Sequence, residues 1–211
     1  MKTRVLLPLI ALAIATALTL PAPAVHAVPI SFFANLSGAN EVPPVVSPGT
    51  GFGLVVLDPD AHTLELDVTF SGLTSNTTAA HIHCCQPLGT NAGVATTLPA
   101  FQGFPLGVTS GTYSSTAFNL TQPEIYNPAF VTAQGGSLPQ AEAALIAGIL
   151  GGMSYLNIHT VNFQPGEIRD QLHPVPEPAT LLLWGSTAAA LGLARWRRRQ
   201  REQRRLTPRP R

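Results

Sequence analysis

Apolar and polar side chains alternate through much of the middle of the chain, a pattern that predicts β-strands. In residues 64–70 every second side chain is apolar, so this strand has one apolar and one polar face. Residues 52–57 precede it across the turn-forming residues 58–62, and the two segments should pair as a hairpin. Further strands are expected at residues 30–36, 80–84, 109–120, 154–160 and 167–172.

One segment is helical in character. Ser137 is a candidate N-cap, Gln140 follows three residues later as in a capping box, and Gly151 and Gly152 end the apolar run of residues 141–150. Many short strands and one helix predict an all-β domain, an antiparallel β-sandwich with one short helix.

The N-terminal residues have the pattern of a secretory signal. Lys2 and Arg4 precede an apolar run, and small residues lead to Ala27. Residues 1–27 are therefore predicted to form a signal peptide helix that is cleaved after Ala27.

A second apolar segment, residues 179–194, lies near the C-terminus. As a helix it would span about 24 Å, short of a hydrocarbon core of ~30 Å, so it is a marginal transmembrane helix. The arginines that follow should stay cytoplasmic, which leaves the preceding domain outside.

The residues around this segment resemble the PEP-CTERM sorting signal of Gram-negative bacteria, which we assign to residues 174–199. Its parts are Pro176, Glu177 and Pro178 before the helix and Arg195, Arg197, Arg198 and Arg199 after it. The resemblance implies processing by an exosortase, a membrane-embedded protease-transpeptidase. It also implies export to the cell surface or extracellular matrix, where exopolysaccharide or matrix proteins are the expected partners. The arginine-rich residues 200–211 extend beyond the usual signal and are expected to be a disordered tail.

Charge is distributed unevenly along the chain. Residues 28–172 contain nine acidic residues and a single basic one, Arg169, which gives this segment a net charge of −8. Nucleic-acid binding is excluded as a function, because binding to phosphates needs a basic surface.

Residues 79–85 gather two of the six histidines and both cysteines of the chain. Alternation places His81 and His83 on the strand face that points away from the core, about 6.6 Å apart. The same argument places Leu156 and Ile158 inward and Tyr155, Asn157 and His159 outward on a second strand. On a third strand it places Glu167 and Arg169 outward. We expect His81, His83, His159, Glu167 and Arg169 to form one polar patch if the three strands are neighbours. The candidates to bond to the histidines are then Asn157, Glu167 and Arg169.

Two interpretations of the patch compete. Its histidines could bind zinc or copper, and the His-x-His spacing is similar to that of copper–zinc superoxide dismutases, although no bridging histidine or second metal set is visible. The interpretation we favour is structural: the imidazoles bond to Glu167, to backbone groups or to each other. No catalytic motif points to an enzyme.

Other candidate groups are less specific. Cys84 and Cys85 could form a strained vicinal disulfide, supply a thiolate ligand, or bridge two molecules. His62 should point to solvent from its hairpin turn. Asp58 and Asp60 in that turn could bind calcium, but an Asp-Pro-Asp sequence in a hairpin more often only forms the turn, which is the interpretation we favour.

The chain also resembles the CHRD domain, first noted in chordin and common in secreted bacterial proteins. The matching segments are residues 36–44, 80–83, 155–160 and 166–172, which bracket a domain at residues 28–173. The family usually has glycine where Asp170 stands. The resemblance implies the fold and an exported setting more than a chemistry. Our first hypothesis is therefore an exported, non-enzymatic module that acts by binding or assembly at the cell envelope or in the matrix, after transient anchoring in the inner membrane. The alternative is a periplasmic or surface metalloprotein that uses the histidine patch, with redox activity as one variant.

Overall fold

The computed structural model describes residues 28–176, 193 and 195–197. The predicted signal peptide with Ala27, most of the predicted transmembrane helix, the tail, and Glu177, Pro178, Arg198 and Arg199 of the sorting motif lie outside the described residues. None of the helices in the described ranges combines the length and apolar character needed to cross a lipid bilayer.

Ten antiparallel strands form one hydrogen-bonded sheet in the described part of the chain. Their order is β5-β4-β8-β9-β1-β2-β3-β6, with β10 beside β1 and β7 beside β3. The strands are β1 Ile30–Ser37, β2 Thr50–Asp58, β3 Thr63–Ser71, β4 Thr77–Cys84, β5 Gly93–Val94, β6 Gly111–Ser114, β7 Phe118–Asn119, β8 Ser154–Thr160, β9 Ile168–Gln171 and β10 His173–Pro174.

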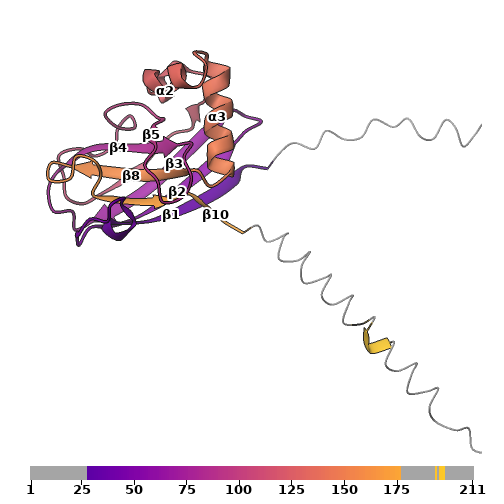
Figure 1. Ribbon diagram of the computed structural model, residues 1–211, viewed down its shortest axis with the longest axis horizontal. Coiled ribbons are helices and arrows are strands. Elements are labelled where there is room, and N and C mark those ends of the chain that lie inside the picture. The colour runs from indigo at the N-terminus through magenta and orange to yellow at the C-terminus, as the bar shows by residue number, and fades with distance from the viewer. Residues whose placement is uncertain (1–27, 177–192, 194, 198–211) are drawn as a thin grey trace, which may run out of the picture.

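The sheet curls, so that the half containing β1, β2 and β3 faces the half containing β4, β8 and β9 (Figure 1). Gly53 of β2 lies directly against Leu156 of β8, and a Cβ atom on Gly53 would come within 2.7 Å of the Leu156 Cδ2 atom. Buried side chains from both halves fill the space between them, among them Ala34, Val55, Leu66, Ile82, Leu156 and Ile158. The mostly β, antiparallel prediction is confirmed, but a single curled sheet supplies both layers of this sandwich-like fold.

Residues 28–176 contain two α-helices where the sequence predicted one. The predicted helix is α3 (Leu138–Leu150), which contacts β4 and β8. The Ser137 hydroxyl donates to Gln140 Oε1 instead of accepting a backbone N–H, so the predicted capping box is not formed. The missed helix, α2 (Pro128–Ala133), is capped by Asn127, whose side chain accepts the Ala129 N–H. Two 3-10 turns, η2 Gly38–Asn40 and η3 Pro123–Ile125, complete the helical elements of residues 28–176.

The predicted strands are found, with one correction. β2 and β3 form the expected hairpin, in which Asp58 pairs with Thr63. Residues 109–120 do not form one strand. They form β6 and β7, which pair with different parts of β3.

Candidate metal centre

Three histidines meet on the face of the sheet that points away from the apolar core. His81 and His83 come from β4, and His159 comes from β8, its hydrogen-bonded neighbour. All three side chains are buried, because loops cover this face, and every residue of β8 is buried on both sides of the sheet. The expected outward direction is therefore right, but the patch lies inside the molecule.

The ring nitrogens converge. His81 Nδ1 lies 3.2 Å from His159 Nε2, and His83 Nε2 lies 3.4 Å from the same atom. One nitrogen from each ring lies within 4.8 Å of the other two. Tetrahedral zinc with Zn–N bonds of 2.0–2.1 Å would separate its nitrogen ligands by about 3.3–3.4 Å, close to the two shorter distances.

Backbone carbonyls determine which nitrogen carries the proton on two of the rings. His83 Nδ1 lies 2.8 Å from Ala92 O, and His159 Nδ1 lies 2.8 Å from Gln164 O. A carbonyl only accepts, so both Nδ1 atoms are N–H donors, and both Nε2 atoms carry lone pairs when the rings are neutral. The contact between the two Nε2 atoms therefore has no proton in it.

Burial keeps these rings neutral. It is the largest cause that lowers the pKa of His81 to about 3, and the neighbouring His159 and His83 lower it further, against an opposing contribution from the Pro99 backbone. The pKa of His83 falls to about 4, again mainly through burial. Burial also lowers the pKa of His159. His81 Nε2 is buried without a hydrogen bond of good geometry to the described residues.

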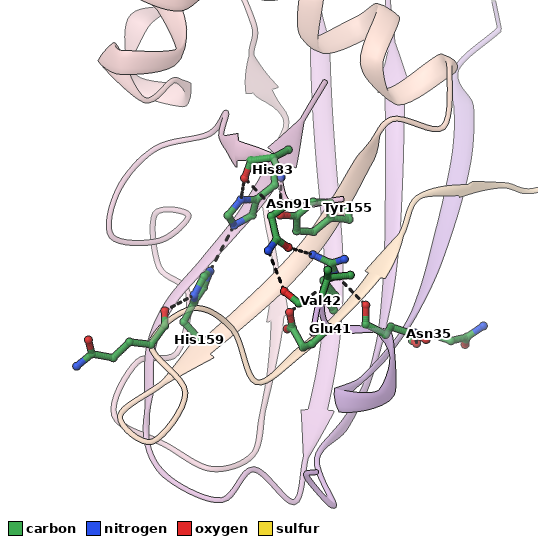
Figure 2. A network of polar contacts seen from close by, with 11 residues as sticks. Asn35, Glu41, Val42, His83, Asn91, Tyr155 and His159 are labelled. Atoms are coloured by element: carbon green, nitrogen blue, oxygen red, sulfur yellow. Dashed lines mark hydrogen bonds and ion pairs between the residues drawn. The ribbon is translucent and has the colours of Figure 1, made fainter. Parts of the chain in front are cut away.

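A polar network continues from His83 toward β9 (Figure 2). The Tyr155 ring stacks on His83, and the Arg169 guanidinium lies over the Tyr155 ring, 4.4 Å from its centroid. Arg169 Nη1 donates to Asn91 Oδ1, and Arg169 Nε lies 3.8 Å from Glu41 Oε2. Burial raises the pKa of Glu41 to about 7, and Arg169 opposes that rise.

Glu167, expected beside the imidazoles, bonds elsewhere. Its carboxylate accepts hydrogen bonds from Ser47 Oγ, Thr160 Oγ1, and the backbone N–H and Oγ1 of Thr74. Burial would raise the pKa of Glu167, but these four donors outweigh it and lower the pKa. Glu167 therefore ties loops to β8, and within the described residues it makes no hydrogen bond to a histidine.

Asn157 lies in register between His81 and Arg169 on the expected face. Its Oδ1 atom is buried and makes no hydrogen bond to the described residues, and the same holds for Glu41 Oε1. Gly166, with a φ of +137°, packs against both, and a Cβ atom there would come within 2.6 Å of either oxygen.

The remaining candidate residues each have a defined position. Cys84 and Cys85 form a vicinal disulfide, one of the three alternatives left open by the sequence. His62 is half exposed but bonds to Glu142 of α3 at 2.6 Å, so the expectation that it points to solvent is only partly right. Asp58 Oδ1 accepts the N–H groups of Asp60 and Ala61, as the turn prediction requires. Asp170, where the family usually has glycine, accepts the Asn35 N–H of β1.

Sequence reasoning missed the partners that hold the centre. Tyr155 was placed on the correct face, and its spacing of four residues from His159 in one strand was the available signal. Ala92, Asn91 and Gln164 lie in loops, and nothing in their local sequence indicated that they would cover the histidines.

Comparison with protein families gives one match. The model of the CHRD domain matches residues 32–172, more than half of the chain. No curated protein and no solved structure gave a significant match.

Proposed function

The chain belongs to the CHRD domain family, and on that premise we propose that it is an exported binding module whose buried histidine centre holds a zinc or copper ion. The module is non-enzymatic in this proposal. The metal ion is either the ligand that the module binds or a structural ion that stabilises the surface with which the module binds another ligand.

One observation carries the metal assignment: His83 Nε2 faces His159 Nε2 at 3.4 Å, while both rings use their only N–H on backbone carbonyls. A structural histidine pair needs a proton between its nitrogens. Sharing one would require a protonated ring, and burial opposes that at neutral pH because it lowers the pKa of both His83 and His159. A cation between the lone pairs removes the conflict. His81 Nδ1 completes a three-nitrogen set of the kind that binds zinc or copper.

The export part of the proposal is supported by sequence. The signal-like residues 1–27, Pro176-Glu177-Pro178 and the arginines from Arg195 onward are the features of an exosortase substrate. In this proposal the protein is held transiently in the inner membrane by residues 179–194. It then acts at the cell envelope or in the extracellular matrix, beside exopolysaccharide or matrix proteins.

Metal analysis tests the proposal. The full chain, purified without a histidine tag and offered zinc or copper, should retain about one ion per molecule. His83→Ala should abolish uptake, because two nitrogens from His81 and His159 do not make a stable site. His173→Ala is the matched control, since this exposed histidine lies in β10 outside the cluster and its loss should leave the metal content unchanged.

Two results would contradict the metal assignment. One is a wild-type protein that stays metal-free after incubation with both ions. The other is a folded His83→Ala variant that keeps the full metal content.

A further inference from the structure

Tyr155 lies against the histidine centre but is not one of its three candidate metal ligands. The β4–β8 register places it directly opposite His83. The two rings are nearly parallel, with centroids 4.7 Å apart and an interplanar angle of 6°. Tyr155 is 3% exposed, so its ring is held firmly and limits rotation of the imidazole.

The Tyr155 hydroxyl also holds the residue that selects the tautomer of His83. It accepts the Ala92 N–H at 3.1 Å and donates to Ala92 O at 3.3 Å. The same Ala92 O accepts the His83 Nδ1–H at 2.8 Å. Tyr155 therefore fixes both the plane of His83 and the position of its proton acceptor.

Arg169 supports this arrangement from the other side of Tyr155. Its guanidinium carbon lies 4.4 Å from the Tyr155 ring centroid, a cation–π contact. Its Nη1 donates to Asn91, the residue before Ala92, and its Nε donates to Asn40 O. Arg169 thus holds the tyrosine ring and the loop that carries the Ala92 carbonyl.

We propose that Tyr155 and Arg169 are positioning residues for His83: a stack from β9 through β8 to β4 that keeps the His83 Nε2 lone pair directed at His159. Groups that orient a ligand through its second nitrogen commonly change metal affinity 10–100-fold when mutated. The inference rests on the proposed metal function for its affinity readout, whereas its tautomer readout needs no metal.

The test compares Tyr155→Leu, Tyr155→Phe and Arg169→Lys with the wild-type full chain. Nitrogen–proton NMR correlations of the imidazoles in metal-free protein should show His83 as a single Nδ1–H tautomer in the wild type. Tyr155→Leu should give mixed tautomers and a zinc affinity about 10–100-fold lower. Tyr155→Phe keeps the stacked ring and should retain most of the wild-type zinc affinity. Arg169→Lys keeps the charge but loses the planar guanidinium, so its zinc affinity should lie between those of the two tyrosine variants.

Tyr126→Leu is the matched control. Tyr126 is equally buried, but its hydroxyl donates to Leu120 O, a residue outside the centre. This variant should lower thermal stability and leave the His83 tautomer and the zinc affinity unchanged.

The outcomes separate the two proposals. If the folded Tyr155 and Arg169 variants keep one tautomer and wild-type zinc affinity, the positioning role is wrong while the metal function stands. If the wild type binds neither zinc nor copper, the metal function is wrong, and the tautomer of His83 in the variants still decides whether Tyr155 and Arg169 position the ring. Should Tyr155→Leu not fold, the zinc affinity and the His83 tautomer of the Arg169→Lys variant decide the question.

Discussion

A buried imidazole can take up a proton or a metal ion at the same lone pair, and burial in this site opposes the proton. His81 and His83 have pKa values of about 3 and 4, mainly because burial penalises the charged ring. At neutral pH the rings therefore remain neutral, and their lone pairs are available to a metal ion without competition from protons.

The lowered pKa values of His81 and His83 also make the stability of the metal-free protein sensitive to acid. Between pH 6.5 and about 4 the unfolded chain takes up protons on its histidines, while the folded chain leaves His81 and His83 neutral. The unfolded state then binds more protons, so stability falls as pH falls through this window. Urea unfolding at pH 7, 6 and 5 should show the loss. The slope in His81→Gln should be smaller by up to about 1.4 kcal/mol per pH unit, and an equal slope would contradict the pKa assignment.

Glu41 should change the pH dependence of stability in the opposite direction to the histidines. Its folded pKa is about 7, above the ordinary value of 4.5, because its carboxyl is buried. From pH 4.5 to 7 the folded state keeps a proton that the unfolded state releases, so this residue lowers stability as pH rises, by up to roughly 3 kcal/mol. Glu41→Gln removes this effect. Chemical unfolding should show the variant gaining stability relative to wild type between pH 5 and pH 8, and a constant difference would refute the assignment.

At the scale of elements, β8 explains how far the sequence could predict the site. Alternation correctly put Leu156 and Ile158 on one face and Asn157 and His159 on the other. Alternation describes only one strand, however, and cannot show that loops from distant parts of the chain bury its polar face. Ala92 is such a loop residue, whereas Gln164 lies in the loop that directly follows β8. The short helix α2 was missed for a related reason, because six residues are too few to show a helical period.

The contact between α3 and the end of β4 gives a test at this scale. Gly148 of α3 packs against the disulfide, and a Cβ atom there would collide with Cys84 Sγ and lie 3.1 Å from both Cys85 Sγ and Ser154 Oγ. Alanine normally favours a helix over glycine by about 1 kcal/mol, but the crowding should reverse the sign. Gly148→Ala should destabilise the protein by about 1–3 kcal/mol in chemical unfolding.

Ala143→Gly, on the exposed side of α3, is the comparison variant. It should lose about 1 kcal/mol through helix propensity alone. A Gly148→Ala protein more stable than wild type would show that α3 does not pack tightly on the disulfide.

At the scale of the whole molecule, the end of the folded domain coincides with the start of the proposed sorting signal. β10 pairs with β1, and the Val175 N–H donates to Ser31 O immediately afterwards. Pro176, the next residue, is exposed. Cleavage at the Pro176-Glu177-Pro178 motif would therefore leave all ten described strands and the histidine centre in the released domain.

This geometry suits a transient anchor, and we predict that the exported protein ends close to the motif. Mass spectrometry of material from the cell surface should give a C-terminal peptide near Pro176 and no peptide from residues 195–211. Replacing Pro176 and Pro178 by alanine should leave a longer, membrane-retained form, because the processing enzyme would no longer recognise its substrate. Surface-exported wild-type protein with an intact arginine tail would instead indicate a permanent membrane anchor. The released domain should have the same thermal unfolding midpoint as the uncleaved form, since the last backbone hydrogen bond described in the domain lies before the cleavage site.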